Sequence, residues 1–193
     1  MKIIYKTGNL LDAQTDVIAH QVNCQGVMGS GIAKQIRDKW SRIYDSYVSY
    51  CYDYITCTHE LLGECQLVQI NDHQYVANLF GQNYYGRDGK RYTSYDGIYD
   101  ALTSLAVQMM DNGMESLAIP YKMSSDRGGA DWNVVLAMIE SVFKDTDVTI
   151  EIWSLTETPE FKKKCSNKSN NSSWQYEMDH KDDWRTVHEM GSL

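Results

Sequence analysis

The chain has 193 residues, of which 42% are hydrophobic and 23% charged, a composition typical of one globular domain with a buried core. Its formal net charge of -8 argues against a general nucleic-acid surface or an acidic-membrane surface, because such partners require clustered lysine and arginine. Five cysteines without CxxC spacing favour reduced thiols over a metal centre or disulfides, so we expect neither a metal nor a cofactor. The sequence has no signal-peptide core and no apolar run near ~18 residues, which predicts a cytoplasmic protein without membrane segments.

The first predicted elements are two strands, a glycine-rich loop and a helix. Residues 2–6 and 16–22 have the β-type composition of strands, and the second of them opens into a polar loop that ends in Gly29-Ser30-Gly31. An amphipathic helix follows directly, with apolar residues at spacings of three and four: Ile32, Ile36, Trp40, Ile43, Tyr44 and Tyr47. A strand, a glycine-rich loop and a helix N-terminus together direct backbone N–H groups at one concave spot. We therefore predict a phosphate-binding site at residues 16–33.

The middle of the chain predicts a pair of strands and a long loop. Residues 64–70 and 74–80 are β-type runs, and the turn-forming residues 71–73 between them predict an antiparallel pair. A polar loop follows at 81–93. A loop of that length inside a compact domain is more often functional than not.

The remaining elements alternate between helix and strand. Ser94 is a predicted N-cap for a helix that ends at Asn112-Gly113, and 116–119 is the next strand. A second glycine-containing loop, 121–131, leads into a third helix, and residues 147–154 alternate as a last strand.

This order of elements predicts an α/β fold in which a mixed sheet lies between layers of helices. In such folds ligands bind beyond the carboxyl ends of the strands, and both glycine-containing loops leave their strands at that end. After Leu155 the composition becomes polar and charged. We predict a domain at 1–155 and a polar C-terminal tail at 156–193, partly disordered or forming a short docking element.

Three motifs carry a resemblance to a known family. The segments AHQVNCQGVMGSGIAKQIR, VANLFGQNYYGRDGKRYTSY and AIPYKMSSDRGGADWNVV occur in this order within residues 1–155. They resemble the macro domain family, in particular its compact branch of ADP-ribose-1''-phosphate phosphatases, whose relatives include a terminal ADP-ribose protein glycohydrolase and an antitoxin that removes ADP-ribose from DNA. The resemblance implies a three-layer α/β/α sandwich with a mixed six-stranded sheet. It also implies ADP-ribose or an ADP-ribosyl derivative as the ligand, and it implies no oligomeric state.

The resemblance implies a set of ligand-binding positions. Asn9 stands where the family commonly has an aspartate that reads the adenine amino group, and an asparagine can accept that hydrogen bond through its carbonyl oxygen. Asn23 matches an asparagine that binds the distal ribose. The second loop departs from a common GIGCG-like run, and we expect Asp126 to point away from an anion, towards Arg127. The implied binding residues are Asn9, Leu10, Asn23, Gly29, Ser30, Gly31, Ile32, Ser124, Ser125, Arg127, Gly128 and Gly129.

The resemblance also implies two catalytic positions. His20 matches a histidine of the yeast-type phosphatases, and Asp131 matches their acidic residue. For each residue a structural role competes with the catalytic one. His20 lies on an apolar strand and is equally explained as a hydrogen-bonded core residue, and Asp131 precedes a helix and is a good N-cap.

Three functions remain open at this point. The leading one is a hydrolase that dephosphorylates ADP-ribose 1''-phosphate. A de-ADP-ribosylating enzyme acting on protein or DNA is the first alternative, although the nucleophilic lysine of such relatives has no match at Phe80, Gly81 or Gln82, which leaves Lys90 in the next loop or a lysine-free mechanism. The second alternative is a module that binds ADP-ribose or a signalling nucleotide without turnover.

Overall fold

The computed structural model describes residues 1–157, and one mixed sheet lies at the centre of the unit Met1–Leu155. Its strands are β1 (Lys2–Thr7), β2 (Val17–Asn23), β3 (Cys65–Asn71), β4 (Gln74–Gln82), β5 (Ser116–Pro120) and β6 (Thr149–Ser154). The helices are α1 (Gly31–Lys39), α2 (Ser41–Asp53), α3 (Tyr95–Asp111) and α4 (Trp132–Phe143), with short 3-10 turns η1 (Leu10–Asp12) and η2 (Thr58–Leu61). The strand order is β1-β6-β5-β2-β4-β3, and only the β3–β4 pair is antiparallel.

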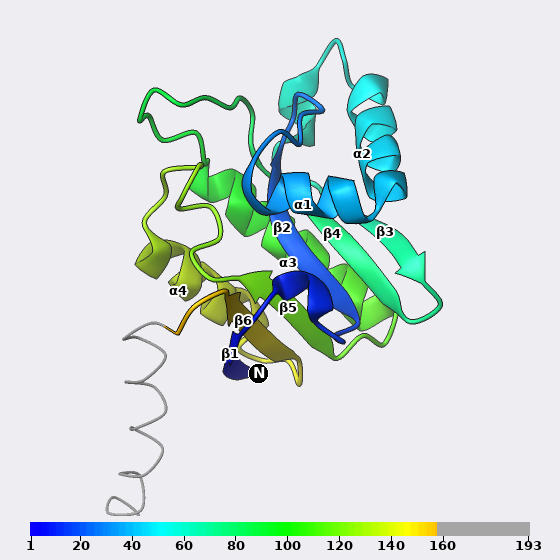
Figure 1. Cartoon of the computed structure of the whole chain (residues 1–193), viewed down its shortest axis with the longest axis vertical. Coiled ribbons are helices and arrows are strands. Elements are labelled where there is room, and N and C mark those ends of the chain that lie inside the picture. Colours follow the sequence, from blue (N-terminus) through cyan, green and yellow to red (C-terminus); the bar gives the residue numbers. More distant parts are fainter. Residues whose placement is uncertain (158–193) are drawn as a thin grey trace, which may run out of the picture. The chain divides into compact units, whose positions relative to one another are not determined.

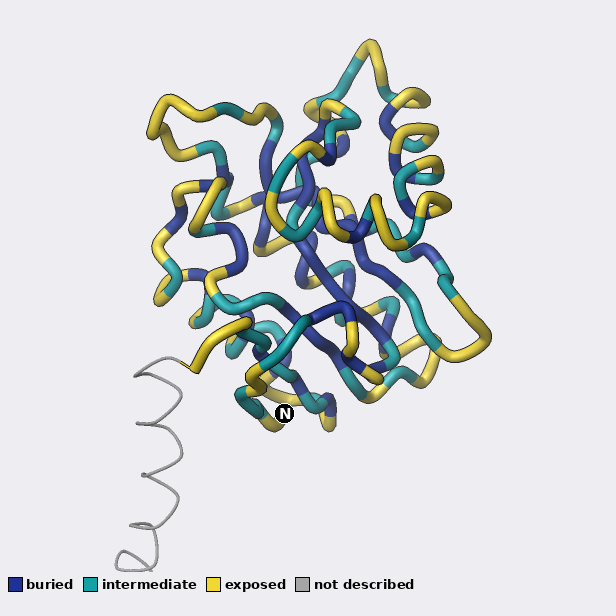
Figure 2. The backbone as a smooth tube through the Cα atoms, viewed as in Figure 1, coloured by how far each residue is buried: buried dark blue, intermediate teal, exposed yellow. Residues whose placement is uncertain are grey.

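Helices cover both faces of this sheet. Along β2, Val17 and Ala19 belong to the apolar cluster that contains α3 and α4, whereas Ile18 belongs to the cluster that contains η1 and α1. Successive side chains of a strand point to opposite faces, so one short strand supplies both cores. Figure 1 shows α1 and α2 on one side of the sheet and α3 on the other, and Figure 2 shows the buried strands between them. The predicted three-layer α/β/α sandwich with a mixed six-stranded sheet is confirmed.

One helix prediction is wrong. The apolar stripe that begins at Ile32 predicts one continuous helix, but the structure has two, which break at Trp40 (φ -134°, ψ 83°). The Trp40 N–H donates to the Ile36 carbonyl at the end of α1, and its own carbonyl accepts from Ile43 at the start of α2. The apolar spacing of three and four runs through both helices, from Ile36 to Trp40 and Ile43, so the sequence pattern does not reveal the corner.

The described part of the chain bears on several other expectations. Cys24, Cys51, Cys57 and Cys65 are free thiols. Within residues 1–157 no helix combines the length and the apolar character that crossing a membrane requires. Residues 158–193, which hold Cys165 and all but the first two residues of the predicted tail, lie outside the described residues.

Candidate functional site

Two adjoining cavities lie at the carboxyl ends of the parallel strands. The larger cavity, about 510 Å³, is bordered by the ends of β2, β4 and β5 and by the loops that follow them. The smaller cavity, about 270 Å³, lies at the ends of β1 and β6. Ile32, Pro120 and Tyr121 line both cavities, so the two form one continuous groove. The groove is where an open α/β sheet is expected to bind its ligand.

The N-terminus of α1 opens onto this groove. Ser30, the N-cap residue, makes no side-chain capping hydrogen bond, although it lines the larger cavity together with Ile32 and Ala33. By contrast, Ser94 and Asp131 cap the N-termini of α3 and α4 with their side chains. The first N–H groups of a helix have no partner within the helix, so the first turn of α1 directs uncapped donors and a partial positive charge at the groove.

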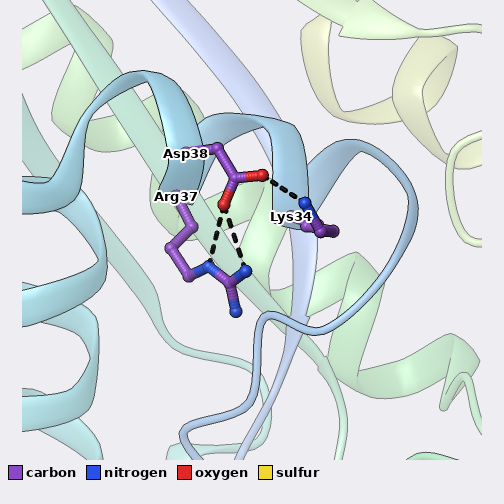
Figure 3. A network of polar contacts seen from close by, with 3 residues as sticks. All are labelled: Lys34, Arg37 and Asp38. Atoms are coloured by element: carbon purple, nitrogen blue, oxygen red, sulfur yellow. Dashed lines mark hydrogen bonds and ion pairs between the residues drawn. The ribbon is translucent and has the colours of Figure 1, made fainter.

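The lysine nearest to these donors is engaged elsewhere. Lys34 lies in the first turn of α1 but pairs with Asp38, which also receives hydrogen bonds from Arg37 (Figure 3). These bonds lower the pKa of the Asp38 carboxyl. Because Lys34 is directed at Asp38 and does not line the cavity, the attraction for an anion at this end of α1 comes from the backbone.

The loop after β5 adds a second polar wall with an unusual backbone. Lys122 and Ser124 have positive φ angles, 57° and 68°, which non-glycine residues rarely adopt. Backbone hydrogen bonds hold the turn, from Gly129 to the Ser125 carbonyl and from Ala130 to the Ser124 carbonyl. Ser124 lines the larger cavity, and its buried hydroxyl has no partner among the described residues. Strain combined with an unpaired buried hydroxyl is typical of a ligand site.

A hydrogen-bonded network joins three segments around the larger cavity. Gln21 on β2 donates to the Gln82 side-chain oxygen (2.7 Å) and to the Thr93 hydroxyl (2.9 Å). The Thr93 hydroxyl donates in turn to the Ser124 carbonyl (3.1 Å). A side chain at Gly128 would collide with this network, because a Cβ atom there would lie closer than 3.0 Å to Thr93 Oγ1, the Ser124 carbonyl and Gln21 Nε2.

Sequence reasoning missed Gln21, and Gln82 is not among the binding residues that the resemblance implies. Both line the larger cavity. The signal was present in the alternation of β2: since His20 and Gln21 are adjacent in a strand, their side chains point to opposite faces. Only one of the two could therefore face the loops, and it is Gln21.

His20 is a correction to the sequence interpretation. Its side chain is fully buried, does not line either cavity and bonds Asn78 Oδ1 through Nε2 at 2.8 Å, while Nδ1 has no partner among the described residues. Burial lowers the pKa of His20 to about 4, partly offset by the bond to Asn78. A neutral, inaccessible imidazole cannot contact a ligand, and the structure gives His20 the role of a core residue.

Asp131 also lies away from the groove. Its Oδ1 accepts from the Asn133 N–H at 2.8 Å and caps α4, and the residue lines neither cavity. The competing interpretation of Asp131 as an N-cap is thus confirmed. Its catalytic role remains a prediction.

The second loop brings some of its predicted residues to the cavity and leaves others out. Ser124, Arg127 and Gly128 line the larger cavity, whereas Ser125 and Gly129 do not. Asp126 lines it as well and is exposed, and the expectation that its carboxylate points away from an anion stays a prediction. The loop is turned so that both charge signs border the cavity.

The predicted residues of the first loop line the larger cavity with one exception. Asn23, Gly29, Ser30 and Ile32 are part of its wall, and Gly31 is not. The Asn23 side chain already organises the loop: Nδ2 donates to the Val27 carbonyl and Oδ1 accepts from Gln25, Val27 and Tyr47. One Nδ2 hydrogen remains for a ligand hydroxyl.

Asn9 and Leu10 line the smaller cavity. Asn9 Oδ1, the atom predicted to accept from a base, accepts from the Leu11 N–H at 3.0 Å and caps η1. Asn9 thus borders the groove with its oxygen held by the backbone, and its role towards a base stays a prediction.

A family model described as Macro domain matches residues 19–139. Among curated proteins, the chain is similar to the DNA ADP-ribosyl glycohydrolase of Mycobacterium tuberculosis (26% identical, over 77% of this chain and 41% of that protein). It is also similar to the ADP-ribose 1''-phosphate phosphatase of Debaryomyces hansenii (31% identical, over 58% of this chain and 66% of that protein). The human ADP-ribose glycohydrolase OARD1 is 25% identical, over 80% of this chain and 92% of that protein. The chain thus spans about two fifths of the mycobacterial relative, and all three relatives are hydrolases.

Solved structures show the same fold. The macrodomain of Mycobacterium tuberculosis DarG has a TM-score of 0.67 at 25% identity and covers 80% of this chain and 98% of its own. Thermosipho africanus DarTG in complex with ADP-ribose has a TM-score of 0.67 at 18% identity and covers 83% of this chain and 44% of its own. The three-layer arrangement is therefore shared with proteins of low sequence identity.

Proposed function

The chain belongs to the macro domain family, and on that premise we propose that it binds an ADP-ribosyl derivative along the groove and hydrolyses ADP-ribose 1''-phosphate. The observation that carries this proposal is the uncapped N-terminus of α1, which lies in a groove together with the unpaired buried hydroxyl of Ser124. Both features supply uncharged hydrogen-bond donors that an anion can use.

The groove has a charged part and an uncharged part, as the ligand does. Arg87, Lys122, Asp126 and Arg127 line the larger cavity, whereas no charged residue lines the smaller one. We assign the diphosphate to the first turn of α1, the phosphorylated distal ribose to the larger cavity and the neutral base to the smaller cavity. This orientation places each charged group of the ligand beside backbone donors or basic side chains.

Hydrolysis requires that a water molecule lose a proton as it attacks phosphorus. The bond from phosphorus to the 1'' oxygen then breaks, this oxygen takes up the proton that the water lost, and ADP-ribose and inorganic phosphate are released. Asp126 is the only carboxylate among the residues that line the larger cavity, so we assign to it the acceptance of the proton from water. Lys122 and Arg127 lie in the same loop and would stabilise the charge that develops on the phosphate oxygens.

The proposal predicts that Asp126→Asn slows phosphate release from ADP-ribose 1''-phosphate by about 10²-fold, the usual contribution of a general base. The measurement is inorganic phosphate released per enzyme under saturating substrate. Asp45→Asn removes a carboxylate from the exposed side of α2 and serves as the control. Equal turnover in the Asp126 variant and the control would remove the assignment, and tight ADP-ribose binding without phosphate release from the unaltered protein would select the binding-module alternative.

Removal of ADP-ribose from a macromolecule is the second candidate. It is favoured by the similarity to a DNA ADP-ribosyl glycohydrolase and by the loop beside the larger cavity, where Tyr84, Tyr85 and Arg87 are exposed. Exposed aromatic and basic side chains suit the bases and phosphates of a single strand. Release of ADP-ribose from modified DNA, but not of phosphate from ADP-ribose 1''-phosphate, would favour this candidate over the first.

A further inference from the structure

The smaller cavity has the chemistry of a site for a flat, neutral ring. Leu10, Ile32 and Trp153 supply apolar surface, and no charged side chain lines the cavity. The indole of Trp153 is fixed on two sides: Nε1 donates to Glu151 Oε2 at 2.9 Å, and its ring packs so closely on Gly8 that a Cβ atom there would lie 3.2 Å away. The cavity therefore offers a rigid aromatic wall, and its polar selectivity depends on a few uncharged groups.

The Asn9 amide is one of these groups, and its orientation is determined by the backbone. Oδ1 accepts from the Leu11 N–H at 3.0 Å in the N-cap geometry of η1. The reverse orientation would direct the amide NH₂ at another N–H donor, which is unfavourable. Nδ2, with two hydrogens, is thus the part of the amide that remains available to a ring in the cavity.

From this orientation we infer that the base subsite accepts a 6-oxopurine, hypoxanthine or guanine, at least as well as adenine. The inference rests on the proposed function, since it concerns the base of the same ligand. A 6-oxopurine carries a carbonyl oxygen at position 6, which accepts a hydrogen bond from the Nδ2 donor of Asn9. Adenine carries an amino group there, which is itself a donor. Its acceptor on Asn9 is the second lone pair of Oδ1, because the first already accepts from the Leu11 N–H.

An aspartate at this position would reverse the preference. It would keep the cap, because a carboxylate oxygen accepts from the Leu11 N–H as an amide oxygen does. Its second oxygen would replace the Nδ2 donor by a charged acceptor, which attracts the adenine amino group and repels the oxygen of a 6-oxopurine. Exchanging asparagine for aspartate at position 9 is therefore expected to change which base is bound and to leave the fold unchanged.

The test is titration calorimetry with ADP-ribose and inosine diphosphate ribose, which differ only at position 6 and its neighbouring ring nitrogen. We expect the unaltered protein to bind inosine diphosphate ribose at least as tightly as ADP-ribose. In Asn9→Asp the ratio of the two dissociation constants is expected to shift towards ADP-ribose by about tenfold, the effect of exchanging one favourable hydrogen bond for an unfavourable contact.

The matched control is Asn71→Asp. Asn71 Oδ1 accepts from the His73 N–H at 3.0 Å in the turn between β3 and β4, so the substitution adds the same charge in the same local geometry, and Asn71 lines neither cavity. Any preference of the unaltered protein for ADP-ribose beyond the error of the measurement would overturn the inference and leave the proposed function standing. An Asn9→Asp ratio equal to that of the control would do the same. Failure to bind either nucleotide would overturn the proposed function itself.

Discussion

Replacing Gly128 with alanine is expected to lower the free energy of unfolding by about 4 kcal/mol and to weaken ADP-ribose binding at least 100-fold. The added Cβ atom would lie closer than 3.0 Å to the Thr93 hydroxyl and to the Ser124 carbonyl. The carbonyl belongs to the backbone of a turn that is already strained, so it cannot move aside without disrupting that turn. Chemical denaturation and calorimetry measure the two effects.

Gly29→Ala is the control for this experiment. Gly29 also lines the larger cavity, but its nearest neighbour to an added Cβ is Val27 Cγ1 at 3.7 Å, an ordinary contact, and its φ is not positive. We expect its free energy of unfolding to stay within about 1 kcal/mol of that of the unaltered protein. If Gly128→Ala were equally mild, the network of Gln21, Thr93 and Ser124 would not be the rigid support that we describe.

Acidification from pH 6.5 to pH 4 is expected to remove about 3 kcal/mol of stability through His20 alone. Burial lowers the pKa of this imidazole from 6.5 to about 4, so in this interval the unfolded chain binds a proton that the folded protein does not. The contribution is complete above pH 6.5 and is lost progressively as the pH falls towards 4. A proton on Nδ1 would be buried without an acceptor, because Nε2 is already the donor to Asn78.

The test compares the pH dependence of the free energy of unfolding with that of His20→Gln. The variant has no group that titrates in this interval at position 20, so its curve should be flatter by about 3 kcal/mol between pH 6.5 and 4, whatever its absolute stability. His73→Gln, in the exposed turn after β3, is the control and should keep the original slope. Parallel curves for all three proteins would contradict the assignment of a buried neutral imidazole.

The order of elements could be predicted from the sequence. The antiparallel pair was predicted from residues 71–73, and the cap at Ser94 from its position before an apolar stripe. Each of these features is local, because turn residues, caps and side-chain periodicity act within a few positions of the chain. The corner at Trp40 was missed because the apolar spacing of three and four continues across it.

The residues that face the ligand were decided by the tertiary structure. The sequence alone shows that a glycine-rich loop precedes a helix, which predicts an anion site at α1. It could not determine that Gln21 rather than its neighbour His20 lines the cavity, or that Asp126 borders it, because these positions depend on strand pairing and on a turn that is closed by contacts with Thr93. A motif specifies which groups are available, and packing between distant segments decides which of them a ligand can reach.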